Sequence, residues 1–220
     1  MSNHRNNLPQ MSDTPFITDG GLETTLIFHH GFELPKFAAF DLLTKTNGYE
    51  VLRRYYTDYI DLAKSHHVGF ILESPTWRAS RDWGDKLGHN DADLKEINRK
   101  SIALLEELRS ESESESTPMV ISGCIGPRGD GYSVSEAMTA GQAYRYHYEQ
   151  IKTLSETKAD LVSAFTINYT TELDDGNPHE LGARYAELAS LLPNLNIFGG
   201  CGGTDHRHVE AICAAIVSNN

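Results

Sequence analysis

Short apolar runs alternate along the chain with longer segments in which hydrophobic residues recur at helical spacing. Runs such as Val68–Leu72 have the length and side-chain types of a buried strand. The segment Tyr49–His66 places Leu52, Tyr56 and Tyr59 on one stripe, which predicts an amphipathic helix. We therefore expect strands at 16–19, 68–72, 118–122, 160–165 and 195–198, and helices at 49–66, 91–109, 140–157, 178–192 and 205–217.

This alternation of strands and helices predicts an α/β protein with a parallel sheet and helices packed outside it. Small or polar residues follow the expected strands, as in Asp19–Gly21, Glu73–Ser74, Gly123–Cys124 and Gly200–Cys201. In (β/α)8 TIM-type barrels the chemistry gathers in such loops at one mouth. The pattern supplies about five of the eight strands of such a barrel, so we expect an incomplete one.

Composition narrows the classes of partner. The 220-residue chain carries a formal net charge of -12, which argues against nucleic acids and anionic membranes and in favour of small molecules. It has neither a run of about 18 apolar residues nor the hydrophobic core of a signal peptide, so we expect a cytoplasmic protein. Cys124, Cys201 and Cys213 are then expected to be reduced thiols.

Two segments lack the pattern of a packed element. Residues 1–13 are polar and rich in Asn, and we expect them to be a disordered tail preceding one barrel domain at 14–220. Residues 110–116 alternate Ser and Glu and are expected to form a mobile surface loop.

A glycine turn near the C-terminus holds one cysteine. Gly199, Gly200 and Cys201 follow an apolar run and precede a predicted helix. Glycines permit backbone conformations that side chains forbid, and free N–H groups at a helix start favour a thiolate. This position suits a reactive or metal-bound sulfur.

Three motifs together resemble the homocysteine S-methyltransferase family: Thr18–Thr24 (TDGGLET), Ile125–Pro127 (IGP) after a strand, and Gly199–Cys201 (GGC) before a helix. The resemblance implies a (β/α)8 barrel in which three cysteines hold a zinc ion that binds the thiol of homocysteine. It also implies methyl transfer from S-methylmethionine or a similar donor, giving methionine, as in methionine biosynthesis.

The chain departs from the family pattern after about residue 170. The first matching block covers about 13–170 and the second begins near Glu172, whereas family members carry roughly three more strands between them. One zinc cysteine of the family lies in that absent block, and Gly202 stands where the family has the second of two adjacent cysteines. Cys201 is therefore the remaining family zinc ligand, and we expect a depleted metal site. Two interpretations of the neighbouring residues remain open. In one, Cys201, Cys124 and His206 form a rebuilt metal site. In the other, Cys124 is a buried residue, and His206 and His208 are exposed to solvent. Cys213 is expected to be core packing.

The resemblance assigns the amino-acid part of homocysteine to the first turn. There Asp19 would pair with the ammonium group while the N–H groups of Gly20 and Gly21 approach the carboxylate. An ordinary Asp-Gly turn is the alternative. Glu23 is either a further substrate contact or an acid favoured by a helix dipole, and Ser74 and Thr76 are expected to face the substrate. In many family members a glutamate follows the phenylalanine at position 165, where this chain has Thr166.

Three functional hypotheses follow. The chain is a zinc-dependent homocysteine S-methyltransferase, or a shortened non-catalytic relative with a vestigial amino-acid-binding mouth, or a metal-free enzyme using Asp19, Glu23 and Glu73 for acid–base chemistry. Because five parallel strands leave two open edges, we also expect marginal stability, exposure of Phe165 and Ile167, and aggregation or pairing between chains.

Overall fold

A single parallel sheet organises the molecule. The computed structural model describes residues 3–129, 138–165, 176–192 and 194–217. Their strands follow the order β4-β3-β2-β1-β5, and all pairs are parallel. The last strand thus lies beside the first, as in a barrel, while β4 and β5 form the edges. The strands are β1 (Phe16–Ile17), β2 (Gly69–Glu73), β3 (Met119–Ile125), β4 (Leu161–Ala164) and β5 (Ile197–Phe198).

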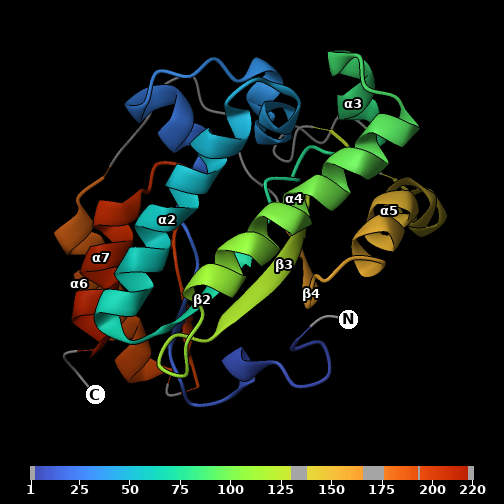
Figure 1. The fold of residues 1–220 in the computed structure, drawn as a ribbon. Helices are drawn as coiled ribbons and strands as arrows, with labels where there is room; N and C mark the ends of the chain where they lie inside the picture. Colours follow the sequence, from blue (N-terminus) through green and yellow to red (C-terminus); the bar gives the residue numbers. More distant parts are fainter. Residues whose placement is uncertain (1–2, 130–137, 166–175, 193, 218–220) are drawn as a thin grey trace.

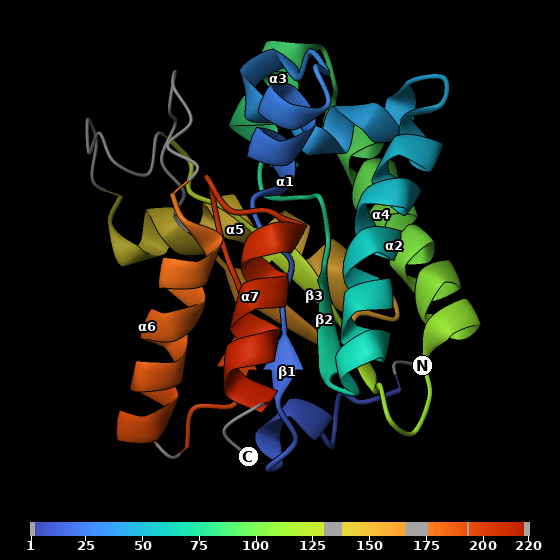
Figure 2. The ribbon, with the colours of Figure 1, turned by 90° about the vertical axis from the view of Figure 1, so that its left-hand side faces the viewer.

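Helices cover the outer face of this sheet, and α1 and α3 lie together at one of its ends (Figures 1 and 2). All five expected strands and five expected helices are present. The sequence pattern missed α1, α3 and the short turns between residues 25 and 44. The helices are α1 (Leu22–Thr24), α2 (Gly48–His66), α3 (Arg81–Leu87), α4 (Asp91–Ser112), α5 (Ala140–Ser155), α6 (Pro178–Leu191) and α7 (His206–Val217). Short 3-10 helices are η1 (Pro9–Met11), η3 (Pro35–Phe37) and η4 (Ala39–Thr44), and η2 (Thr25–His29) is a π-helix.

Side-chain caps fix the starts of three long helices. Asn90 accepts hydrogen bonds from the backbone N–H groups of Ala92 and Asp93, which begins α4. Thr139 caps α5 in the same manner, and Asn177 precedes Pro178 at the first position of α6. These caps satisfy N–H groups that a helix start otherwise leaves without partners.

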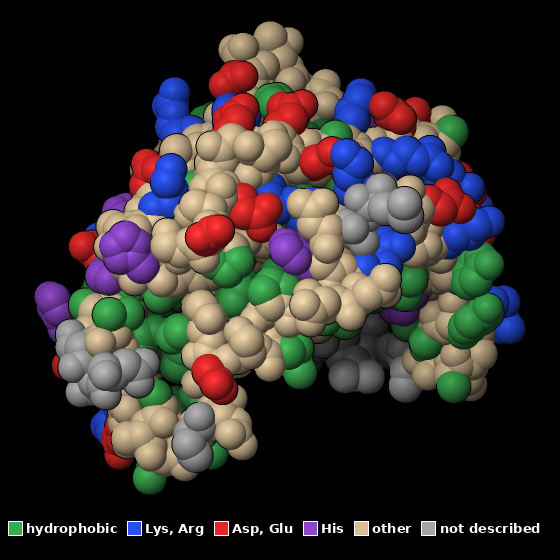
Figure 3. Space-filling view, turned by 60° about the horizontal axis from the view of Figure 1, so that its bottom comes forward, with side chains coloured by type: hydrophobic (Ala, Val, Ile, Leu, Met, Phe, Trp, Pro, Cys, Tyr) green, Lys and Arg blue, Asp and Glu red, His purple; other side chains and the backbone are tan. Residues whose placement is uncertain are grey.

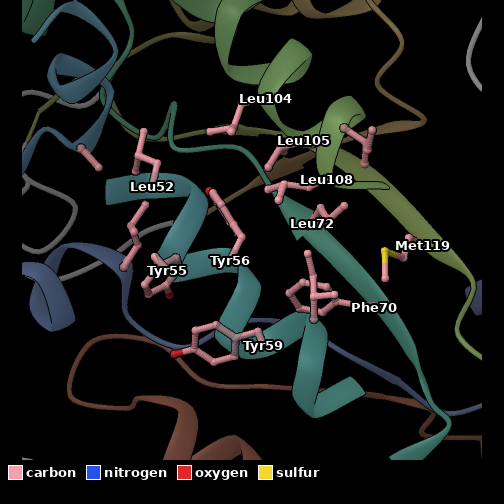
Figure 4. Packing of buried hydrophobic residues seen from close by; sticks show 14 of the residues in the cluster. Leu52, Tyr55, Tyr56, Tyr59, Phe70, Leu72, Leu104, Leu105, Leu108 and Met119 are labelled. Carbon is pink, nitrogen blue, oxygen red and sulfur yellow. The ribbon is translucent and has the colours of Figure 1, made fainter. Parts of the chain in front are cut away.

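The core lies between the sheet and α2 and α4. Tyr55, Tyr56 and Tyr59 of α2 are buried, and Tyr59 stacks on Phe70 of β2 (Figure 4). Leu104, Leu105 and Leu108 of α4 close the same cluster. The hydroxyls of Tyr55 and Tyr56 reach polar partners near the strand ends, Oδ2 of Asp19 at 3.0 Å and the Glu73 carbonyl at 2.6 Å. The Tyr59 hydroxyl has no hydrogen-bond partner among the described residues.

The N-terminal segment differs from its expectation. We expected residues 1–13 to be disordered, yet residues 3–13 contain η1 and contact the body of the protein. The backbone N–H of His4 donates to Asp160, and Arg5 donates to the carbonyl of Ala159. Asp160 also pairs with buried Arg109 at 2.6 Å. These partners explain the difference, because the backbone N–H of His4 and the side chain of Arg5 bond to acceptors next to β4.

The Ser/Glu segment also departs from the expectation of a loop. Residues 110–112 continue α4, and a backbone bridge joins Ser114 to Thr117. The backbone N–H of Glu113 bonds to the Arg109 carbonyl, and its carboxylate accepts the N–H of Met119. Helical hydrogen bonding therefore extends through the first polar residues before the chain turns into β3.

Hydrophobic side chains are exposed on both sides of the open part of the sheet. Figure 3 shows such side chains on either side of a hollow. Val162 and Phe165 lie at the β4 side, and Leu191 and Leu192 at the α6 side. Phe165 is 39% exposed, as expected, whereas Ile167 lies outside the described residues. The exposed apolar residues flank the position of the strands that a complete barrel would add.

Candidate functional site

An inner cavity opens at the carboxyl ends of β1, β2 and β3. Its volume is about 160 Å³. It is lined by Thr18–Thr24, Phe37, Glu73–Pro75, Trp77, Arg78, Cys124, Phe165 and Gly200–Gly202. The strand-end loops identified in the sequence therefore share one mouth, which is the usual location of chemistry in parallel α/β folds.

Asp19 is the acid at the end of β1. It is 8% exposed, and the hydroxyl of Tyr55 lies 3.0 Å from its Oδ2. Burial raises the pKa of Asp19 well above its usual value, and the nearby Glu73 charge raises it further. The Tyr55 hydrogen bond opposes this rise. Asp19 is thus held in place, and burial favours its neutral form.

Two glutamates share the cavity with Asp19. Desolvation raises the pKa of Glu23 to about 7, although the Arg78 charge partly counters it. Burial likewise raises the pKa of Glu73 to about 7. Oε1 of Glu73 accepts a 2.8 Å hydrogen bond from Ser163, whereas its buried Oε2 has no hydrogen-bond partner among the described residues. The cavity therefore contains carboxyl oxygen atoms that a donor group of a ligand can satisfy.

Ser74 and Thr76 join the ends of β2 and β3. The Ser74 hydroxyl accepts the N–H of Cys124 at 2.8 Å, and Thr76 donates to the Cys124 carbonyl at 2.7 Å. Ser74 lines the cavity, whereas Thr76 is fully buried behind it. The direct role of Thr76 is therefore to hold the strand ends together.

Cys201 lies at the mouth and packs against the first turn. A Cβ on Gly21 would come within 2.7 Å of the Cys201 carbonyl oxygen, so the close approach requires glycine. The helix-start argument led us to expect a thiolate, but the structure gives the opposite direction. Desolvation raises the pKa of Cys201, and the charges of Glu23 and Asp19 raise it further, while a Gly202 N–H lowers it. Helix α7 begins only at His206, too far along the chain to favour the thiolate.

The other cysteines and histidines have separate surroundings. Cys124 is 5% exposed and lines the cavity, and Cys213 is fully buried in the core, as expected. His206 is exposed, but the expectation of a solvated His208 is wrong because its Nδ1 lies 3.0 Å from buried Asp205. Neither histidine lines the inner cavity.

Sequence reasoning missed several cavity residues. Arg78 is buried, with its guanidinium 3.8 Å from the centre of the Trp83 ring and 4.5 Å from that of Trp77. The Trp77 indole N–H donates to the carbonyl of Phe165. Phe37 reaches the cavity from η3. The sequence feature that could have pointed to these cavity residues is the adjacent pair Trp77 and Arg78, which follows the polar end of β2.

Comparison with known proteins now identifies the family. The sequence model described as homocysteine S-methyltransferase matches residues 16–176. The chain belongs to the homocysteine S-methyltransferase family. No curated protein matches it.

Solved structures support the fold. The oxidised form of the homocysteine methyltransferase MmuM from Escherichia coli aligns with a TM-score of 0.66 and 17% identity, covering 96% of this chain and 99% of that one. The metallated form of the same enzyme aligns with a TM-score of 0.66 and 16% identity, covering 99% of this chain and 100% of that one. The family fold is thus present as a half-barrel of five parallel strands, an incomplete version of the TIM-type barrel.

The described residues do not fit the zinc ion that the family implies. A protein zinc site needs at least three ligands in a tetrahedral arrangement. Across the ranges that the structure describes, no three His, Cys, Asp or Glu side chains are placed to hold a metal ion. Gly202 follows Cys201, and Cys124 is a buried thiol whose pKa is raised by burial. A site built from Cys201, Cys124 and His206 is therefore absent from this part of the chain. Thr166 and residues 167–175 lie outside the described residues.

Proposed function

We propose that this chain binds the amino-acid part of homocysteine, or of a close analogue, in the inner cavity as a non-catalytic relative of the methyltransferases. The observation that carries the proposal is the pair of acids at the ends of neighbouring strands, buried Asp19 and half-buried Glu73. Oε2 of Glu73 has no hydrogen-bond partner in the part of the chain that the structure describes, and Asp19 is oriented by Tyr55. An ammonium group supplies three N–H donors, and its positive charge stabilises the ionised form of both acids.

Proton exchange accompanies such binding. Without a ligand, burial holds the pKa of Glu73 near 7 and that of Asp19 above its usual value. A bound ammonium group stabilises the ionised carboxylates, so their pKa values fall and protons leave the cavity. Of the two turn glycines, Gly20 offers its N–H to the ligand carboxylate, because the N–H of Gly21 already donates to the Thr204 carbonyl at 2.9 Å.

Zinc-assisted methyl transfer is not part of the proposal, because the described residues do not form a zinc site. A homocysteine thiol without a metal has an ordinary, largely protonated sulfur at neutral pH. Cys201 and Cys124, themselves with raised pKa values, supply no positive charge to stabilise a thiolate. Transfer from S-methylmethionine or a similar donor is therefore expected to be far slower than in a zinc-containing family member.

Calorimetry and a transfer assay together test the proposal. Homocysteine should bind the purified chain, and Asp19→Asn should weaken that binding at least about tenfold, since a charge-assisted contact is lost. A Glu96→Gln variant on the surface of α4 serves as the control. Equal affinities of wild type and Asp19→Asn would contradict the binding proposal. Methionine formation at the rate of a full-length relative would contradict its non-catalytic part.

Acid–base chemistry is a second candidate function. It is favoured by Glu23 and Glu73, because pKa values of about 7 suit groups that give and take protons at neutral pH. A metal-independent activity that disappears in Glu73→Gln but survives in Cys201→Ala would support it. Activity that persists in Glu73→Gln would count against it.

A further inference from the structure

An outer groove adjoins the inner cavity and has the opposite charge character. It is lined by Ile27, Phe32–Phe37, Arg78, Trp83 and Lys86, with a volume of about 810 Å³. Phe37 and Arg78 line both spaces, so they form the boundary between them. The inner cavity contains one buried and two half-buried acids, Asp19, Glu23 and Glu73, whereas the outer groove contains three cationic side chains and one acid, Glu33.

Two of these cations are held against one aromatic ring. The Lys86 ammonium nitrogen lies 3.9 Å from the centre of the Trp83 ring, and the Arg78 guanidinium carbon lies 3.8 Å from it. The charges are therefore less than about 8 Å apart and repel each other. Contact with the ring offsets part of this repulsion. An anion bound beside Lys86 would offset more of it.

Lys36 brings the third cation to the groove through an uncommon backbone conformation. Lys36 and Phe37 have φ values of 59° and 54°, in the left-handed region that residues other than glycine rarely adopt. The Lys36 carbonyl accepts a hydrogen bond from Arg78, which ties this turn to the Trp83 ring system. Among the described residues, no carboxylate forms an ion pair with Lys36 or Lys86. This arrangement keeps two cationic side chains available to a ligand in a strongly acidic chain.

We propose that the outer groove is a binding site for a carboxylate, with Lys36 and Lys86 as its charge contacts. Its ligand class is an elongated zwitterion whose cationic end lies at the acids of the inner cavity and whose carboxylate extends past Phe37 and Arg78 into the groove. This inference rests on the proposed function, because the cationic end of the ligand would bind the same acids as the amino acid. The carboxylate contact adds one subsite to that function.

A matched pair of ligands tests the carboxylate contact. The first is 4-(trimethylammonio)butanoate, which has a permanent cation at one end and a carboxylate at the other, and the second is its methyl ester. By calorimetry on the full chain, the acid should bind about tenfold more tightly than the ester. The Lys36→Gln/Lys86→Gln double variant should reduce this preference to about twofold or less. Both lysines are exposed, so the variant is expected to fold, and its thermal unfolding is compared with that of the wild type.

Lys100→Gln, an exposed lysine of α4 outside the groove, serves as the matched control and should retain the full preference. The groove proposal is overturned if the wild type binds neither compound at millimolar concentration, or if the double variant keeps the preference for the acid. Homocysteine titrations separate the two proposals. If the double variant loses the preference for the acid over its methyl ester and the wild type does not bind homocysteine, the groove proposal is supported and the amino-acid site is rejected. If the wild type binds homocysteine but binds the acid and the ester with equal affinity, the amino-acid site is supported and the groove proposal is rejected.

Discussion

The hydroxyl of Tyr55 lies 3.0 Å from Oδ2 of Asp19, although 36 residues separate them in sequence. It links the core of α2 to the acid at the end of β1, and it lowers the pKa of a carboxyl group that burial otherwise raises. Packing between α2 and the sheet therefore determines the orientation and the charge of the cavity acid.

Removing this hydroxyl should weaken ligand binding. In Tyr55→Phe the pKa of Asp19 is expected to rise further, so less of it is ionised and homocysteine affinity falls about fivefold to tenfold, equivalent to about 1 kcal/mol. Calorimetry measures the change. Tyr49→Phe removes an exposed hydroxyl from the same helix, one that bonds Glu107 on the surface, and should leave affinity unchanged. A similar loss in both variants would point to a general effect on α2.

Stability should decrease as pH rises from 5 to 8. Glu23 and Glu73 have folded-state pKa values of about 7 against ordinary values of 4.5, so the folded state holds more protons than the unfolded state across this interval. Their contribution is therefore complete below about pH 4.5 and is lost as pH rises through 7, by about 2 to 3 kcal/mol for each group. Urea unfolding at pH 5, 6, 7 and 8 measures this slope.

The variant Glu73→Gln mimics the protonated side chain and should flatten that slope. It is expected to match the wild type near pH 5 and to exceed its free energy of unfolding at pH 8 by about 2 kcal/mol. Glu96→Gln, with a surface carboxylate, provides the comparison and should keep the wild-type slope. An unchanged slope in Glu73→Gln would show that Glu73 titrates normally.

Restoring the adjacent cysteine should not restore zinc binding. A Cβ on Gly202 would have Thr24 Cγ2 at 3.8 Å as its nearest neighbour, and Gly202 is not among the glycines with positive φ. Gly202→Cys should therefore fold as the wild type does and gain one reactive thiol. Metal analysis after dialysis should find far less than one zinc per chain, because two thiolates leave the ion short of ligands. One zinc per chain would reveal a third ligand in the protein.

The buried ion pair between Arg109 and Asp160 should contribute strongly to the free energy of unfolding. Asp160→Ala leaves buried Arg109 without its 2.6 Å partner and also removes an acceptor from the N–H of Ile121. We expect a loss of about 3 to 5 kcal/mol in the free energy of unfolding. Glu187→Ala, which breaks an exposed pair with Arg184, should cost less than about 0.5 kcal/mol. Urea unfolding, or the soluble fraction where Asp160→Ala fails to fold, distinguishes them.

Sequence periodicity predicted the regular part of the fold. Strands such as β3 and helices such as α2 have enough apolar residues at periods of 2 or 3.6 to define them. Helices α1 and α3 are too short to establish a period. His208 was expected in solvent because nothing in the local pattern indicates that Asp205 would accept it inside the fold.

The candidate site was predictable where small or polar residues directly follow a strand. Asp19, Gly20 and Gly21 are adjacent in sequence, so a motif identified them together. Tyr55 and Arg78 reach the cavity through contacts between elements that are far apart in sequence. No local spacing of residues indicates such contacts. Burial is the main cause of the raised pKa of Cys201, and the charges of Glu23 and Asp19, from the opposite end of the chain, raise it further. This direction reversed an expectation based on the nearest helix.

Strand order also limits how two copies of this chain can associate. Five strands that follow the curvature of an eight-stranded barrel leave an opening three strands wide. A second five-stranded copy is too broad for that opening, so contact at one edge leaves the other edges free to recruit further chains. We expect open-ended assemblies, rather than a closed dimer, if copies of this chain associate through these edges.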